Sequence, residues 1–164
     1  MNGYMTNGTY DFLEKLKEKH PSYDIMVMQQ SDKSIAYYED AKPSIFQTSR
    51  NYEIVIQKGT FSKEGFVVLN HLPVTDEGRP IIEMQFKKRS KNIENTAGFQ
   101  AFRLLRPNRG NTYVVMVQWY DKESYITWKN SSSFKQSHSK KEKPSYLAGP
   151  SYSETFVMKE KEEE

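Results

Sequence analysis

Hydrophobic residues recur along this chain with two periods, the 3.6-residue period of helices and the two-residue period of strands. Residues 10–19 carry the first helical pattern, for which Thr9 is a suitable N-cap and Pro21 a stop. The expected apolar stripe of this helix consists of Phe12, Leu13 and Leu16. Strand patterns then follow at three places, residues 24–30, 34–39 and 51–58, and the first two of these predict a hairpin.

From Gly65 onward the pattern becomes more regular. The expected strands are residues 66–72, 99–106, 112–119 and 152–159. Pro80 begins a helix that ends at Arg89, and Asp121 caps a second helix. The serines at 131–133 end that helix and cap a further short helix that reaches His138. The turn at residues 107–110 lets its two flanking strands pair antiparallel.

The order of these elements is strand, helix, strand, strand, helix, strand, which predicts a ferredoxin-like α+β sandwich. Helices cover one face of such a sheet, and a second sheet is the natural cover for the other. That second sheet comes either from another chain or from residues 24–58, and we expect a monomer whose halves imitate a dimer. The expected organisation is therefore an N-terminal extension (1–60), the ferredoxin-like domain (61–160) and a disordered acidic tail (161–164).

Composition narrows the available chemistry. The 164 residues include no cysteine, so thiolate catalysis, iron–sulfur ligation and cysteine zinc sites are excluded. Three histidines are available as nitrogen ligands. A net charge of +3 is too small for a nucleic-acid footprint, and we expect no nucleic-acid partner. The first ten residues lack a basic start and an apolar run, and no later segment resembles a membrane span. We therefore expect a cytoplasmic protein with no membrane partner.

Three motifs carry a family resemblance. They are G-F-Q-A-F-R-L-L-R-P at residues 98–107, D-K-E-S-Y-I-T-W at residues 121–128, and S-x-x-F-x-x-x-H at residues 131–138. Together they resemble the antibiotic-biosynthesis-monooxygenase (ABM) fold, and within it the Isd-type haem-degrading monooxygenases. The resemblance covers residues 65–159 for the family. It extends over the whole chain for the Bacillus HmoB group, and the staphylococcal TRAP protein is also similar.

The resemblance implies a haem oxygenase that binds haem as substrate and cofactor, opens the macrocycle with O2 and an external electron donor, and releases iron. Its catalytic set would be Asn70, Trp128 and His138. His138 would ligate the iron, the Asn70 amide would donate a hydrogen bond on the oxygen side, and the Trp128 indole would distort the ring. The haem propionates would meet lysines near the ligand, namely Lys135, Lys140 and Lys141. The electron donor would be a reductase or a small-molecule reductant.

Ordinary structural roles compete with this interpretation. An isolated histidine in a Ser-rich and Lys-rich segment is usually exposed, and Trp128 with Tyr125 at helical spacing is typical of core packing. Asn70 could mark a bulge or a strand end. His71 should point to the opposite face of the sheet, where we expect a structural role. Two other functions also stay open: a non-catalytic TRAP-like signalling or haem-binding protein, and a cofactor-independent monooxygenase acting on a quinol or another aromatic substrate.

Overall fold

The computed structural model describes residues 1–131 and 146–159. These residues form eight strands and three α-helices, with one short 3-10 helix before the sixth strand. The strands are β1 (Asn2–Gly8), β2 (Met26–Gln29), β3 (Ser34–Asp40), β4 (Arg50–Gly59), β5 (Gly65–Pro73), β6 (Phe99–Pro107), β7 (Thr112–Trp119) and β8 (Tyr152–Met158). The helices are α1 (Tyr10–Lys19), α2 (Arg79–Arg89), η1 (Ile93–Asn95) and α3 (Lys122–Lys129). The expected short helix ending at His138 lies outside the described residues.

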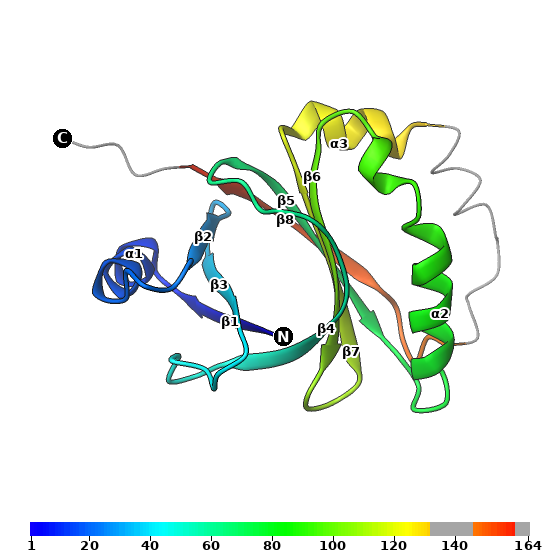
Figure 1. Cartoon of the computed structure of the whole chain (residues 1–164), viewed down its shortest axis with the longest axis horizontal. Helices are drawn as coiled ribbons and strands as arrows, with labels where there is room; N and C mark the ends of the chain where they lie inside the picture. Colours follow the sequence, from blue (N-terminus) through cyan, green and yellow to red (C-terminus); the bar gives the residue numbers. More distant parts are fainter. Residues whose placement is uncertain (132–145, 160–164) are drawn as a thin grey trace.

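All eight strands form one closed barrel in the order β1-β3-β2-β8-β5-β7-β6-β4 (Figure 1). Within this ring the N-terminal half runs β4-β1-β3-β2 and the C-terminal half runs β8-β5-β7-β6. Each half therefore has its fourth strand beside its first, then its third and its second. This is the ferredoxin-like order, so the N-terminal strands complete a pseudo-dimeric barrel as the sequence predicted.

The two seams between the halves are unequal. Along one seam, β4 and β6 pair over seven residue pairs, from Tyr52↔Pro107 to Gly59↔Ala101, with one irregularity. Along the other seam, Gln29↔Val157 is the single pair that joins β2 to β8 among the described residues. The β2–β3 turn is closed by the backbone N–H of Gln30, which donates to the carbonyl of Lys33 at 2.8 Å.

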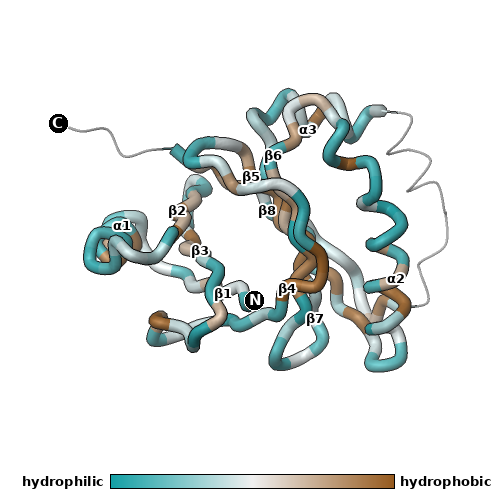
Figure 2. The backbone as a smooth tube through the Cα atoms, in the orientation of Figure 1, coloured by the Kyte–Doolittle hydropathy of each residue, from teal (hydrophilic) through white to brown (hydrophobic). Residues whose placement is uncertain are grey.

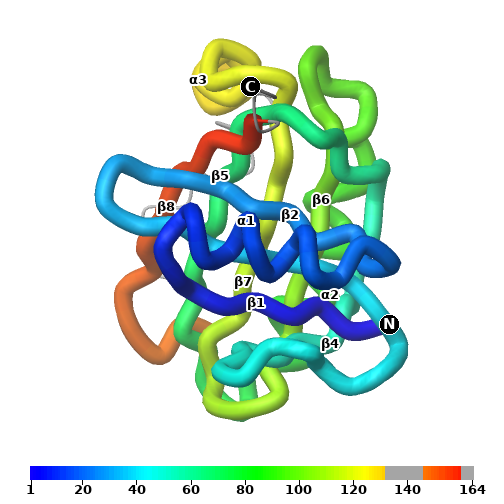
Figure 3. The backbone as a smooth tube through the Cα atoms, turned by 90° about the vertical axis from the view of Figure 1, so that its left-hand side faces the viewer, coloured from blue at the N-terminus to red at the C-terminus, as the bar shows by residue number. Residues whose placement is uncertain are grey.

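Buried side chains form three layers. The barrel interior is filled by apolar residues that include four methionines, Met5, Met28, Met116 and Met158. Outside the C-terminal half, α2 and α3 cover a second cluster, and hydrophobic positions gather along the strands on that side (Figure 2). Outside the N-terminal half, α1 lies across the strands and Leu13 is fully buried beneath it (Figure 3). No helix in residues 1–131 or 146–159 is long and apolar enough to span a membrane.

Two details differ from the sequence-based expectations. Strand β1 was not predicted, because two glycines and two asparagines among its seven residues give it a weak strand propensity. It is a strand because β3 and β4 pair with it on either side. The predicted apolar stripe of α1 is also partly wrong: Leu13 and Leu16 pack inward, but Phe12 is 57% exposed.

A buried ion pair links the two halves inside the barrel. Arg103 of β6 is only 2% exposed, and its Nε donates to Oε2 of Glu39 in β3 at 2.8 Å. Its guanidinium also donates to the backbone carbonyls of Lys58, Gly59 and Phe102. The hydroxyl of Tyr37 donates to the same carboxylate at 2.7 Å. Burial, followed by the Glu39 charge, raises the pKa of Tyr37 well above its ordinary value, so the phenol remains a donor.

Replacing Glu39 by Ala should destabilise the protein by about 3 kcal/mol, because the buried Arg103 charge loses its counter-ion. The measurement is the free energy of unfolding from urea denaturation followed by circular dichroism. Glu53→Ala is the matched control, since Glu53 also pairs with an arginine of β6, at 2.8 Å, but its side chain is 56% exposed. Equal losses in the two variants would show that the buried pair has no special role.

Candidate functional site

Strand β5 carries two sets of side chains, one on each face of the barrel wall. Phe66 and Val68 belong to the cluster beneath α2 and α3, whereas Val67 and Leu69 belong to the barrel interior. By the alternation of a regular strand, Asn70 shares the helix-side face with Phe66 and Val68. Asn70 is half-buried, and it is a polar group within an apolar row that continues at Leu72.

Elsewhere on this face, four aromatic side chains gather around a fifth, Trp119. Phe66 pairs with Trp119 in the β5–β7 register. The Trp119 and Trp128 ring centroids are 5.4 Å apart, and those of Trp119 and Tyr125 are 6.3 Å apart. Phe99 meets Trp119 edge-on at 6.3 Å. Trp128 therefore packs against the sheet as part of an aromatic cluster, which is the ordinary role that the sequence also allowed.

The local sequence around α3 fixes this cluster. The Asp121 carboxylate caps the helix by accepting from the Ser124 backbone N–H at 2.8 Å and from the Ser124 hydroxyl at 2.7 Å. These bonds lower the pKa of Asp121. Gly98 adopts the left-handed φ of +82° and lies against the Ser124 side chain, where any Cβ would collide. The carbonyl of Gly98 accepts from the Tyr120 backbone N–H at 2.7 Å, which brings α3 down onto the ends of β6 and β7.

Helix α2 is tied to the same sheet by polar bonds. Arg106 and the Tyr113 hydroxyl both donate to the Glu83 carboxylate. Burial alone would raise the pKa of Glu83, but hydrogen bonds from Arg106 and Tyr113 outweigh it and lower the pKa. Ile82 is fully buried beside this network. Both helices that cover the helix-side face are therefore fixed to the sheet by hydrogen bonds.

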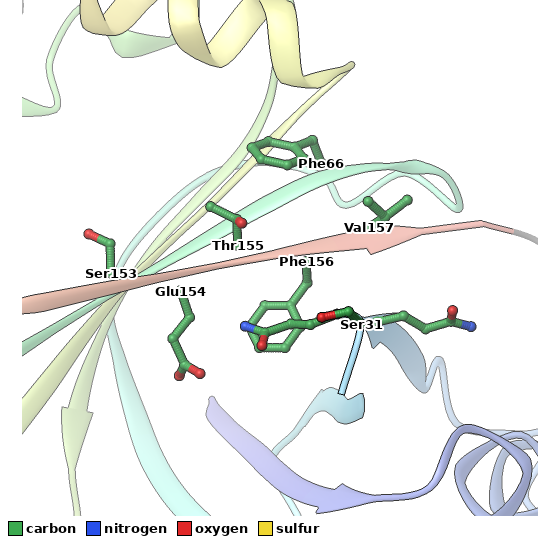
Figure 4. A pocket seen from close by; sticks show the side chains of 9 residues that line it. Ser31, Phe66, Ser153, Glu154, Thr155, Phe156 and Val157 are labelled. Carbon is green, nitrogen blue, oxygen red and sulfur yellow. The ribbon is translucent and has the colours of Figure 1, made fainter. Parts of the chain in front are cut away.

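Asn70 has one polar partner in the described structure. The Ser153 hydroxyl of β8, directly opposite in the β5–β8 register, donates to Oδ1 of Asn70. An open groove of about 560 Å³ runs along β8, and Ser153 is one of the residues that line it. Figure 4 shows Ser153, Thr155 and Phe66 on one side of the β8 ribbon and Glu154 and Phe156 on the other. The groove thus reaches the helix-side face as well as the barrel mouth.

His71 lies on the opposite face from Asn70, as predicted. Its Nε2 is 2.8 Å from Oε1 of Glu154, and its ring stacks on Tyr152 with centroids 4.5 Å apart. Lys33, in the β2–β3 turn, forms an ion pair with the other oxygen of Glu154. Burial lowers the pKa of His71 more than the bond to Glu154 raises it. This network joins the weak β2–β8 seam, which supports the structural role expected for His71.

The structure brings Asn70 and Trp128 to one face but describes only part of the predicted site. Asn70 pairs with Val115, which lies four positions before Trp119 along β7. At the rise of a β-strand, Asn70 is therefore roughly 13 Å along the sheet from the level of Trp119. The other predicted residues, His138, Lys135, Lys140 and Lys141, lie outside the described residues. No group of three or more potential metal-ligating His, Asp or Glu side chains occurs in the described part of the chain.

The described residues between Asn70 and Trp128 are apolar. Val68, Val117 and Phe66 form an apolar floor between the Asn70 amide and the Trp128 indole, and all three side chains are buried in the helix-side core. The Trp119 Nε1 is buried and has no hydrogen-bond partner among the described residues. An apolar floor that carries an amide donor and borders a cluster of aromatic rings is chemically compatible with a porphyrin face.

Comparison with known proteins identifies the family. Residues 65–140 match the family described as antibiotic biosynthesis monooxygenase. The chain is 30% identical over 148 residues to the signal transduction protein TRAP of Staphylococcus aureus strain MRSA252, covering 90% of this chain and 88% of the relative. The chain belongs to the TRAP family and carries an ABM domain.

Solved structures similar to this ABM protein include two of different character. A structure described as a major regulator of staphylococcal pathogenesis superposes with a TM-score of 0.85 at 25% identity, covering 98% of this chain and all of that one. A heme-degrading enzyme from Listeria monocytogenes superposes with a TM-score of 0.78 at 20% identity, covering 97% of this chain and all of that one. At 20% identity the second similarity establishes the shared fold and leaves the activity open.

Two residues of the helix-side face, Trp119 and Ser153, have a role that the sequence does not predict. Trp119 was placed at the end of a strand without a role, although its proximity to Trp128 follows from the short strand-to-helix connection. Ser153 had no signal of its own, because its contact with Asn70 joins positions 83 residues apart. A ferredoxin-like order puts the last strand beside the first strand of its half, but the register that pairs Ser153 with Asn70 is visible only in the structure.

Stability should fall as the pH decreases below the ordinary pKa of histidine, about 6.5. Because burial lowers the pKa of His71, the unfolded chain binds this proton at a higher pH than the folded chain does, and protonation favours unfolding. Urea denaturation at several pH values from 7.5 to 5 measures the effect. In His71→Gln the loss across this window should be smaller, and an unchanged slope would exclude His71 as its source.

Proposed function

We propose that this protein binds haem on the helix-side face of its ABM domain and opens the macrocycle with O2 and an external electron donor, releasing iron. The observation that supports this most is the placement of Asn70 and Trp128. These two residues of the predicted catalytic set lie on one face with an apolar floor between them. Both belong to a domain whose fold is shared with a heme-degrading enzyme.

Each described residue has a defined task in this proposal. The apolar floor excludes water from the ring, and the aromatic rings of α3 and β7 contact one of its edges. The amide nitrogen of Asn70 donates a hydrogen bond towards the oxygen side of the haem, since its oxygen is engaged by Ser153. His138 ligates the iron, and Lys135, Lys140 and Lys141 neutralise the propionates.

The similarity to TRAP favours one competing function. TRAP proteins are described as signal transduction proteins, and this chain shares 30% identity with one of them over most of its length. The alternative is a protein that uses the same face to bind a ligand, or a partner, without chemistry. Turnover separates the two, because a signalling or storage protein leaves bound haem intact.

Anaerobic titration with haemin should give a Soret band that saturates at one haem per chain. His138→Ala should lose this band or weaken haem binding strongly, because the protein loses its iron ligand. His20→Ala is the control, since His20 follows α1 on the N-terminal half and lies away from the ABM domain. If wild-type protein gave no saturable Soret band, the haem proposal would be wrong.

Adding O2 and ascorbate to the haem complex, with catalase present, should bleach the Soret band and release iron that a chelator captures. Asn70→Ala should retain haem but degrade it about a hundredfold more slowly, a loss typical for one donor that stabilises developing charge. The measurement is the single-turnover decay of Soret absorbance. Haem that persists in the wild type would favour the signalling or storage function, and wild-type decay in Asn70→Ala would remove the role assigned to the amide.

A further inference from the structure

The contact between Ser153 and Asn70 joins two strands that are adjacent in the barrel but distant in sequence. Asn70 of β5 and Ser153 of β8 are direct cross-strand partners, so their side chains leave the sheet on the same face. The Ser153 hydroxyl donates to Oδ1 of Asn70. The amide of the predicted catalytic asparagine therefore has a specific neighbour, and it comes from a strand to which sequence analysis gave no functional role.

The hydrogen bond from Ser153 restricts the terminal side-chain torsion of Asn70, which sets the direction in which the amide N–H2 group points. The terminal torsion of an asparagine side chain is broad and poorly defined by its own sterics. An amide oxygen only accepts hydrogen bonds and an amide nitrogen only donates them, so the two ends are chemically different. With Oδ1 engaged by Ser153, Nδ2 is the free end, and it has no protein acceptor in the part of the chain that the structure describes.

The pair is also accessible to a ligand. Ser153 lines the groove along the edge of β8, together with Thr155 and Phe66 on the helix-side face (Figure 4). Phe66 in turn contacts the α3 ring of Tyr125, with centroids 5.8 Å apart. The groove therefore lies along β8 between Ser153 and Phe66, and it is bordered on its other side by Gln29, Gln30 and Ser31.

We infer that Ser153 is a positioning residue for Asn70, which holds the amide with its N–H2 group turned to the bound ligand. This inference rests on the proposed function, because it assigns Ser153 a task at the same site. Ser153 acts through Asn70 and does not itself contact the reacting atoms. A donor that is already oriented needs no reorganisation when charge develops on the ligand, and this is why orientation affects the rate.

The chain offers a matched pair of substitutions at this position. Ser153→Thr keeps the hydroxyl, whereas Ser153→Val removes it. Threonine and valine have nearly the same shape, so the two variants differ mainly in the presence of the hydroxyl. Both suit a strand, so the fold should tolerate either one. Asn70→Ala and the double variant Asn70→Ala/Ser153→Val complete a cycle that measures whether Ser153 acts through Asn70.

Two readouts do not depend on turnover. In the haem-free protein, the order parameter of the Asn70 side-chain amide from 15N relaxation should fall in Ser153→Val and stay at the wild-type value in Ser153→Thr. In the ferric haem complex, the affinity for azide should fall about tenfold in Ser153→Val, in line with the usual effect of removing a group that orients a contacting residue. Haemin affinity should not change in either variant.

The rate of haem degradation should fall about tenfold in Ser153→Val and recover in Ser153→Thr. The double variant should be no slower than Asn70→Ala, because Ser153 has nothing left to position. If wild-type protein bound haemin and degraded it but Ser153→Val matched it in azide affinity and rate, the inference would be wrong and the proposed function would stand. An additive loss in the double variant would also overturn it. A wild type that bound no haemin would overturn both.

Discussion

The register of β5 between its two neighbours determines what each face of the barrel wall contains. β7 pairs with β5 over eight residue pairs and β8 over seven, so the strand is held on both sides. This register places Asn70 on the helix-side face and His71 in the barrel interior. A slip of one residue would exchange them, because side chains alternate along a strand. An imidazole would then enter the apolar face, and Glu154 would lose one of its two partners.

Most of the architecture was predictable from local sequence, and the exceptions depend on contacts between segments that are distant in sequence. Helix α3 is defined by its Asp121 cap, and the β6–β7 hairpin by its turn residues and apolar strands. Strand β1 was missed because pairing with β3 and β4, and not its own composition, makes it a strand. Phe12 was misplaced because helical periodicity alone does not locate the edge of a buried stripe. The opposite orientations of Asn70 and His71 followed from strand alternation, but the partner of Asn70 depends on a non-local register.

The closed ring of strands has a repeated order, yet the outer faces of its halves are covered differently. In the N-terminal half the β3–β4 loop lies over the outer face and is fixed by side chains of the strands beneath it. The Tyr4 hydroxyl donates to the carbonyl of Lys42 at 2.6 Å, and the Thr6 hydroxyl donates to that of Thr48. The Tyr38 hydroxyl accepts from the Ile45 backbone N–H at 2.8 Å. The β3–β4 loop therefore covers part of the outer face of the N-terminal half.

The corresponding face of the C-terminal half is covered by α2 and α3 without such a loop among the described residues, and this difference bears on why a pseudo-dimer would hold one site. Helix α3 has no fully buried residue, and it meets the sheet mainly through Tyr125 and Trp128. Away from those rings the face carries two polar side chains, Asn70 and Ser153, beside an open groove that Ser153 lines. The carbonyls of Lys42 and Thr48 are engaged by side chains of the N-terminal strands, whereas the amide nitrogen of Asn70 has no protein acceptor among the described residues. We therefore expect the N-terminal half to act as the scaffold that closes the barrel, and the C-terminal half to carry the chemistry.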